Sequence, residues 1–67
     1  MAPIERVAMT IRKLREQRGM TQGQLAERAG VSREYVARLE AGRYDPSLST
    51  LEKLAKALKV DVAKLLK

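Results

Sequence analysis

Residues 20–43 read MTQGQLAERAGVSREYVARLEAGR, and this stretch decides the fold. Thr21 is followed three residues later by Gln24, which is the spacing of a capping box at the start of a helix. Gly30 marks the end of that helix, because glycine adopts the left-handed backbone of a helix C-terminus without a steric penalty. Ser32 then offers the N-cap of a second helix. The stretch therefore predicts two short helices joined by a tight turn.

Apolar residues at steps of three and four extend the helical pattern to both sides of this stretch. Upstream, they predict an amphipathic helix that ends at Gly19. Downstream, Ser47 can cap a fourth helix, and Asp61 starts a short fifth one. We therefore expect an all-α fold, with five helices packed into one domain over residues 1–67. The apolar positions of these helices are Ile4, Val7, Ala8, Ile11 and Leu14; Leu25, Ala26 and Ala29; Val36 and Leu39; Leu51, Leu54, Ala55 and Leu58; and Val62, Leu65 and Leu66.

The residue inventory argues against an enzyme. The chain has no histidine and no cysteine, so the usual general base, thiol nucleophile and metal ligands are missing. Its eight Asp and Glu residues are scattered among basic residues, and no two of them form a pair suited to acid–base work. We therefore predict no catalytic residue, no metal site and no cofactor.

Basic residues outnumber acidic ones, with 14 Lys and Arg against 8 Asp and Glu and a net charge of +6. This balance favours a polyanionic partner, nucleic acid first and an anionic membrane second. All eight arginines lie between Arg6 and Arg43, whereas every lysine except Lys13 lies from Lys53 onward. Because the planar guanidinium fork of arginine fits guanine edges and phosphates, the segment up to Arg43 is the expected reading part.

The sequence contains no sign of a membrane segment. No apolar run approaches the roughly 20 residues that a membrane span needs, and the N-terminus lacks the apolar core of a signal peptide. The predicted helices use nearly the whole chain, so no second domain is left to sense a ligand. We therefore expect a soluble cytoplasmic protein without a membrane or small-molecule partner.

Two helices linked by a short glycine turn form the unit that places its second helix in the major groove of DNA. In the predicted recognition helix, 32–42, the exposed positions are Arg33, Glu34, Ala37 and Arg38. Arginine bound to guanine through two hydrogen bonds is the commonest base-specific contact. We expect Arg33 and Arg38 to read guanines and Glu34 to accept from a cytosine amine or to brace one of the arginines. The alternative is a solvated face with a Glu34–Arg38 ion pair.

Over residues 4–66 the chain resembles the helix-turn-helix family of phage repressor and Cro proteins. The resemblance implies a lambda-repressor-like fold, double-stranded DNA as the partner, and base readers at the same positions in the recognition helix. The motifs that carry it are Thr21-Gln22, Leu25-Ala26, Ala29-Gly30-Val31-Ser32, Leu39-Glu40-Ala41-Gly42-Arg43, Pro46-Ser47-Leu48 and Leu54-Ala55-Lys56-Ala57-Leu58.

Three further residues are candidates for contacts to the DNA backbone. Gln22 occupies the first turn of its helix, where amide groups point at a phosphate. The resemblance implies that this glutamine contacts the backbone and braces the recognition helix, and the alternative is a plain capping residue. Arg43, just past the recognition helix, is the best second candidate for a phosphate contact. Tyr35 either gives its hydroxyl to a phosphate or packs its ring beside Arg38.

The resemblance also implies a structural ion pair and exposes two departures from the family pattern. Arg15 and Glu40 occupy positions that commonly hold a partly buried arginine–glutamate pair, which ties the first helix to the end of the recognition helix. Gly23 stands where a helix-forming residue is usual, at a cost of roughly 1 kcal/mol relative to alanine. Lys59 stands where glycine is frequent; if its backbone is left-handed, lysine costs about 1 kcal/mol or more.

A single module of this kind reads only a few base pairs, so we expect a homodimer on a palindromic operator. The candidate contact is the last helix, and Leu66 is the preferred dimer residue. Val62 and Leu65 on the same helix are at least as well explained as residues that close the core.

Two functions remain in competition at this stage. The first is a small transcriptional regulator, such as a repressor or controller, that binds an operator. The second is a protein-interaction module, an antitoxin or bridging factor, that uses the same fold. Strong salt dependence of DNA binding favours the first, and salt-insensitive pairing with another protein favours the second.

Overall fold

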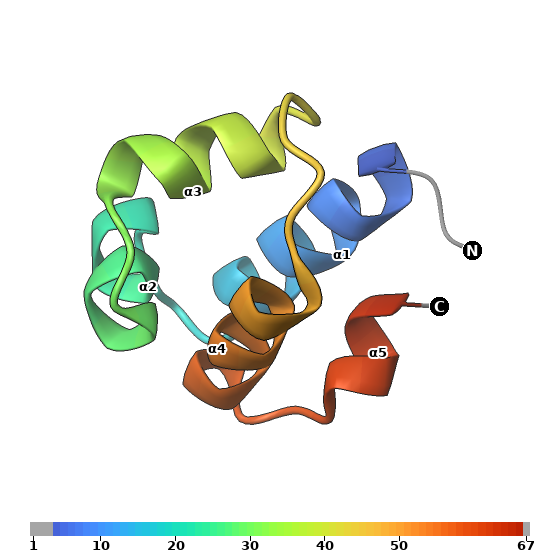
Figure 1. Ribbon diagram of the computed structural model, residues 1–67. Coiled ribbons are helices and arrows are strands. Elements are labelled where there is room, and N and C mark those ends of the chain that lie inside the picture. Colours follow the sequence, from blue (N-terminus) through green and yellow to red (C-terminus); the bar gives the residue numbers. More distant parts are fainter. Residues whose placement is uncertain (1–3, 67) are drawn as a thin grey trace.

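The computed structural model describes residues 4–66, which form five helices and no strand, so the predicted all-α fold is confirmed. The helices are α1 (Ile4–Gln17), α2 (Gln22–Ala29), α3 (Arg33–Glu40), α4 (Leu48–Leu58) and α5 (Val62–Leu66). α3 packs on α2 and α1, α4 packs on α2, and α5 contacts α4 and α1 (Figure 1). None of the helices within the described residues has the length and apolar character needed to cross a membrane.

The boundaries of the helix-turn-helix are set by the capping residues that the sequence predicts. Thr21 accepts from the backbone N–H of Gln24 at 3.0 Å, and the side chain of Gln24 accepts from the N–H of Thr21 at 2.8 Å. Gly30 ends α2 in the left-handed conformation, with φ 72°. Ser32 then accepts from the backbone N–H of Tyr35 at 3.0 Å and starts α3. These local hydrogen bonds fix where α3 begins.

Side chains from all five helices form one buried core, and this core fixes the rotation of α3. Val36 and Leu39 on its inner face are 0% and 1% exposed. Because a fully buried aliphatic side chain stabilises the fold by roughly 1.5–3 kcal/mol relative to exposure, α3 cannot turn this face outward without a large loss. The largest fully buried side chains are Ile11, Leu25, Leu39, Leu54, Leu58, Leu65 and Val36.

The recognition helix is shorter than the predicted range 32–42. Ser32 caps α3 from outside, and the helix ends at Glu40. Gly42 has φ 76°, and its N–H donates to the carbonyl of Leu39 at 3.0 Å. The last predicted residues of the helix are therefore its C-terminal cap, because the left-handed backbone of Gly42 turns the chain away.

Both departures from the family pattern have a visible structural setting. Lys59 follows α4 with φ 58° and ψ 43°, so the condition for a backbone strain of roughly 1–2 kcal/mol is met. Gly23 lies within α2, where an added Cβ would have ordinary 3.9 Å contacts to Arg33 Cδ and Thr21 Oγ1. Space therefore does not require glycine at position 23, and only helix propensity is lost there.

Candidate nucleic-acid interface

The outer face of α3 carries the three side chains predicted to read bases. Arg33, Glu34 and Arg38 are exposed, while Val36 and Leu39 point into the core. The ion pairs formed within the described residues do not include Glu34 with Arg38. The exposed face of α3 therefore presents two guanidinium groups and one carboxylate, none of them locked in a mutual ion pair.

Arg38 is held by an aromatic residue from the connection between α3 and α4. Its Nη1 donates to the hydroxyl of Tyr44 at 3.0 Å. The ring of Tyr44 stacks on that of Tyr35, with centroids 5.1 Å apart and ring planes inclined by 23°. The hydrogen bond to Tyr44, followed by the electrostatic effects of Tyr44 and Glu34, raises the pKa of Arg38 above its ordinary value. The guanidinium group is thus oriented before any ligand binds.

Sequence reasoning missed Tyr44 and left Tyr35 with two alternative roles. The ring of Tyr35 packs on Tyr44 and against the core, and it is Tyr44 that accepts from Arg38. One signal was available in the sequence, since these two tyrosines are the whole aromatic content of the chain. They lie on either side of the turn at Gly42, which brings them together.

Arg15, Glu40 and Gln22 form a network that ties α1, α2 and α3 together. Arg15 donates to both carboxylate oxygens of Glu40, from Nε at 2.7 Å and from Nη2 at 3.1 Å. Its Nη1 donates to the carbonyl of Met20 at 2.7 Å. The side chains of Arg15 and Glu40 are only 11% and 3% exposed.

The environment of Arg15 raises its pKa above the ordinary value. The hydrogen bond to Glu40 is the largest cause, burial opposes it, and the charges of Glu40 and Glu16 add to it. Because the pKa is raised, the contribution of charged Arg15 to stability is complete below its unfolded-state pKa. It disappears only as the pH rises through the raised folded-state value.

Gln22 stands at the start of α2, where its side chain reaches across to the end of α3. Its Nε2 donates to Oε1 of Glu40 at 3.1 Å, so it braces α2 against α3 in the way the resemblance implied. Beside it lies a shallow groove of about 250 Å³. The groove is lined by Arg12, Arg15, Gln22, Ala37, Glu40 and Ala41. Arg43, the other predicted phosphate ligand, is exposed just beyond α3.

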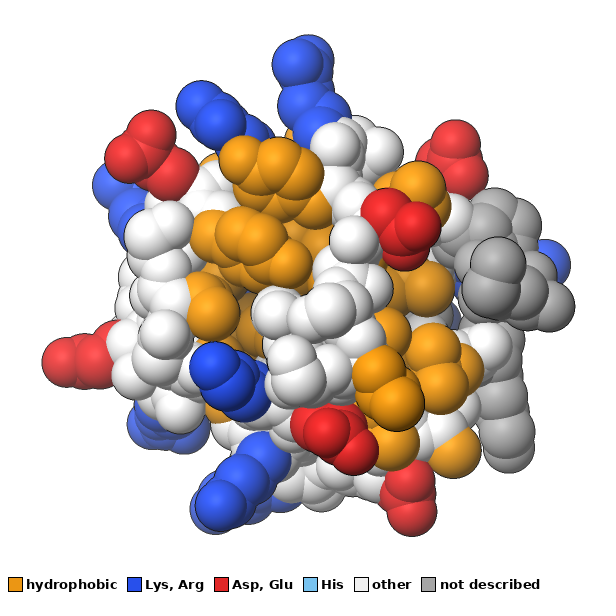
Figure 2. All heavy atoms as spheres, in the orientation of Figure 1, with side chains coloured by type: hydrophobic (Ala, Val, Ile, Leu, Met, Phe, Trp, Pro, Cys, Tyr) orange, Lys and Arg blue, Asp and Glu red, His pale blue; other side chains and the backbone are white. Residues whose placement is uncertain are grey.

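Leu66 lies on the outside of α5 and is 42% exposed. Leu65 is fully buried and Val62 is half-buried, so these two close the core. Two other large apolar side chains are exposed, Met9 at 72% and Leu48 at 59%. Figure 2 shows hydrophobic side chains gathered near the α3–α4 connection and over the side that carries α5.

The comparison with protein families decides the assignment. Residues 11–65 match the model described as "Helix-turn-helix". The chain belongs to the helix-turn-helix family. It is 51% identical over 57 residues to the immunity repressor protein of Bacillus phage phi105, covering 85% of this chain and 40% of the repressor. It is also 50% identical over 48 residues to an HTH-type transcriptional regulator of Methanothermobacter thermautotrophicus, covering 72% of this chain and 70% of that regulator.

Solved structures of helix-turn-helix regulators have the same arrangement of helices. The restriction–modification controller protein C.AhdI from Aeromonas hydrophila superposes with a TM-score of 0.90 at 34% identity, over 92% of this chain and 90% of that one. The clp gene regulator ClgR from Corynebacterium glutamicum gives 0.91 at 33% identity, over 98% of this chain and 70% of that one. The predicted resemblance to phage repressors is therefore confirmed at the level of the family.

Proposed function

We propose that this chain binds double-stranded DNA sequence-specifically, as a small transcriptional regulator of the repressor or controller type. The observation that carries the proposal is the outer face of α3, which presents Arg33 and Arg38 while its inner face is packed into the core. The phage immunity repressor and the controller protein to which the chain is similar support the same role. In the complex α3 lies in the major groove, both arginines read guanines, and Glu34 accepts from a cytosine amine.

Backbone contacts flank this reading helix at both ends. The first-turn amides of α2 point at a phosphate, and Gln22, already braced on Glu40, adds its side chain. Arg43 contacts a second phosphate from the far end of α3. Tyr35 lies between these two backbone contacts. These contacts fix the register of α3 on the duplex, whereas base contacts supply the specificity.

Salt dependence tests this proposal directly. A duplex selected from random DNA should bind with an affinity that falls steeply between about 50 and 200 mM salt, with a log–log slope near −0.9 per neutralised phosphate. Arg43→Ala should make the slope less steep by about 1 per subunit while leaving base preference unchanged. Salt-insensitive pairing with another protein, together with no selected duplex, would instead favour the protein-interaction module.

The regulator acts as a homodimer on a palindromic operator in this proposal, with Leu66 in the interface. One module buries about 600–1,000 Å² on DNA, which reads too few base pairs for a useful site. The proposed role needs no catalysis, and it requires access to the genome, which in a phage-infected bacterium or an archaeon lies in the cytoplasm.

Leu66→Lys should shift the protein toward monomers in sedimentation at micromolar concentration, because a charge replaces an exposed apolar contact. Met9→Lys is the matched control, since Met9 is exposed on α1 and no dimer role is assigned to it. The interface lies elsewhere if Leu66→Lys sediments like the unmodified protein, or if Met9→Lys dissociates it equally.

A further inference from the structure

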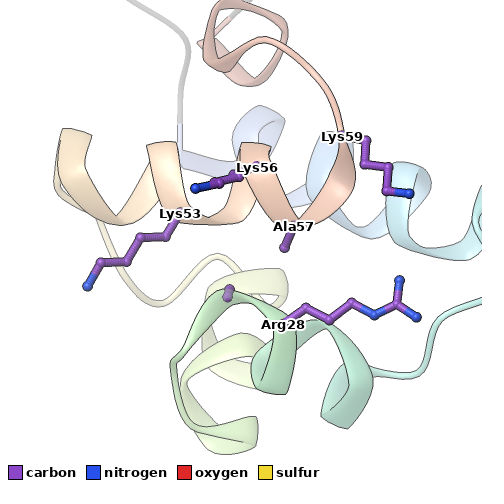
Figure 3. A pocket seen from close by; sticks show the side chains of 6 residues that line it. Arg28, Lys53, Lys56, Ala57 and Lys59 are labelled. Atoms are coloured by element: carbon purple, nitrogen blue, oxygen red, sulfur yellow. The ribbon is translucent and has the colours of Figure 1, made fainter.

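A second basic surface lies between α2 and α4. It is an open groove of about 370 Å³ with cationic side chains on both sides and two alanines at its base. Figure 3 shows Arg28 reaching out from α2 and Lys59 from the end of α4 on the same side, with Lys53 extending on the other. No acidic residue lines it. The lining residues are Arg28, Ala29, Lys53, Lys56, Ala57 and Lys59.

The charge of this groove is not neutralised by the protein itself. The ion pairs within residues 4–66 involve only Arg12 and Arg15 as cations. Cations in the last turns of helices interact favourably with the helix dipole, which accounts for Arg28 and Lys56. The same effect covers Lys59 at the C-cap of α4, but it does not account for Lys53, one turn earlier on that helix.

Lys59 adds a cation held on a strained backbone to one side of the groove. Within the described residues it is the one non-glycine residue with positive φ, at 58°. Glycine takes this conformation without strain, so the sequence keeps a lysine here at a conformational cost. Strained residues are enriched at functional sites, and here the strained residue also caps α4 through its backbone N–H. The side chain of Lys59 lines the groove.

The groove is separate from the surface proposed to bind DNA. All of its lining residues come from α2, α4 and the residue that follows α4, and none belongs to α3. Gln22, the α2 residue proposed to contact DNA, starts that helix, whereas Arg28 and Ala29 end it, so a duplex on α3 leaves the groove free. A small molecule would be poorly enclosed, since small-molecule sites surround most of the ligand surface.

We propose that this groove binds an acidic polypeptide segment of a partner protein while α3 occupies DNA. Carboxylates of the segment pair with Arg28, Lys53, Lys56 and Lys59, and a small apolar side chain rests on Ala29 and Ala57. Charge complementarity of this kind speeds association and selects the partner. The regulator would thus recruit an acidic protein to its binding site on DNA; the groove itself does not depend on the DNA-binding role.

Binding of a fluorescent peptide rich in Glu, Asp and Ala tests the proposal, with a Gln/Asn version as the neutral control. Lys53→Glu should weaken binding of the acidic peptide about tenfold, whereas Lys64→Glu, the same charge change on α5, should weaken it less than about threefold. Lys59→Gly should raise the melting temperature and still weaken binding, because it relieves the strained backbone and removes one cation. A loss of fold cannot produce that combination.

Three outcomes of the peptide titrations would overturn the proposal. They are absence of binding to the acidic peptide, equal binding of the neutral peptide, and equal losses for Lys53→Glu and Lys64→Glu. The same variants are also titrated with duplex DNA. If Lys53→Glu weakens duplex binding more than Lys64→Glu does, the groove serves nucleic acid and the acidic-partner proposal is wrong. The DNA-binding proposal is tested separately, by measuring duplex binding of the Arg38→Ala variant without peptide.

Discussion

Glu40→Gln is expected to lower the free energy of unfolding by up to about 3–5 kcal/mol, the cost of removing one partner of an ion pair that is fully buried. The carboxylate of Glu40 accepts from Arg15 twice and from Gln22 once, and its side chain is 3% exposed. The neutral amide leaves the part-buried guanidinium of Arg15 with only the exposed carboxylate of Glu16, 4.0 Å away, as a counter-charge. For a domain worth roughly 3–10 kcal/mol at about 0.05–0.15 kcal/mol per residue, this loss approaches global unfolding. Urea unfolding at neutral pH measures it.

Glu16→Gln is the matched control for this experiment. It makes the same chemical change in the exposed Arg12–Glu16 pair, whose side chains are 63% and 55% exposed, and it touches Arg15 only through a 4.0 Å contact, so it should cost less than about 1 kcal/mol. Replacing the buried pair together, as Arg15→Met with Glu40→Leu, should recover much of the loss, because no unpaired charge remains. Equal stabilities of Glu40→Gln and Glu16→Gln would show that the network does not stabilise the fold.

The network has a consequence for DNA binding as well as for stability. Glu40 is the last residue of α3, and Gln22 is the first residue of α2. Their hydrogen bond joins the end of α3, the proposed reading helix, to the start of α2, whose first-turn amides we propose to face a phosphate. Arg15 of α1 also donates to Glu40 and so connects both helices to α1. A variant that keeps its fold but loses this hydrogen bond should therefore bind DNA more weakly, even though the groups that contact DNA are unchanged.

The features that could be predicted from the sequence are local ones. The caps at Thr21, Ser32 and Ser47 act on backbone groups three residues away, so a short window contains the whole interaction. Helical periodicity predicted the core positions for the same reason, because it relates residues only three or four positions apart. The ion pair of Arg15 with Glu40 spans 25 residues and was reached through the family resemblance, because periodicity puts Arg15 only beside the apolar face.

The contact that escaped prediction depends on an irregular segment. Tyr44 lies in the connection between α3 and α4, where no periodicity predicts the direction of a side chain. Its position follows from the left-handed turn at Gly42, after which the Tyr44 side chain reaches back to Arg38 and Tyr35. The groove between α2 and α4 was missed for a related reason: its cations are far apart in the sequence, and only helix packing brings Arg28 to the lysines of α4.

Arg38→Ala is expected to weaken binding to the selected duplex by about 1–3 kcal/mol, roughly 5- to 150-fold, while binding to random duplex changes little. A bidentate contact to guanine is lost at the specific site, whereas random DNA is held mainly through its backbone. Arg6→Ala, an exposed arginine on α1, removes the same charge and should lower both affinities slightly and equally. Competition titrations with the two duplexes measure the ratio.

Tyr44→Phe tests whether the orientation of the Arg38 guanidinium group contributes to DNA binding. The variant keeps the ring that stacks on Tyr35 but removes the hydroxyl that accepts from Arg38 at 3.0 Å. Arg38 must then be ordered during binding, so affinity for the selected duplex should fall roughly 2- to 10-fold, with unfolding little affected. Equal losses of Arg38→Ala on selected and random duplexes would contradict base reading. A Tyr44→Phe variant with full specificity would show that Arg38 reads its base without this support.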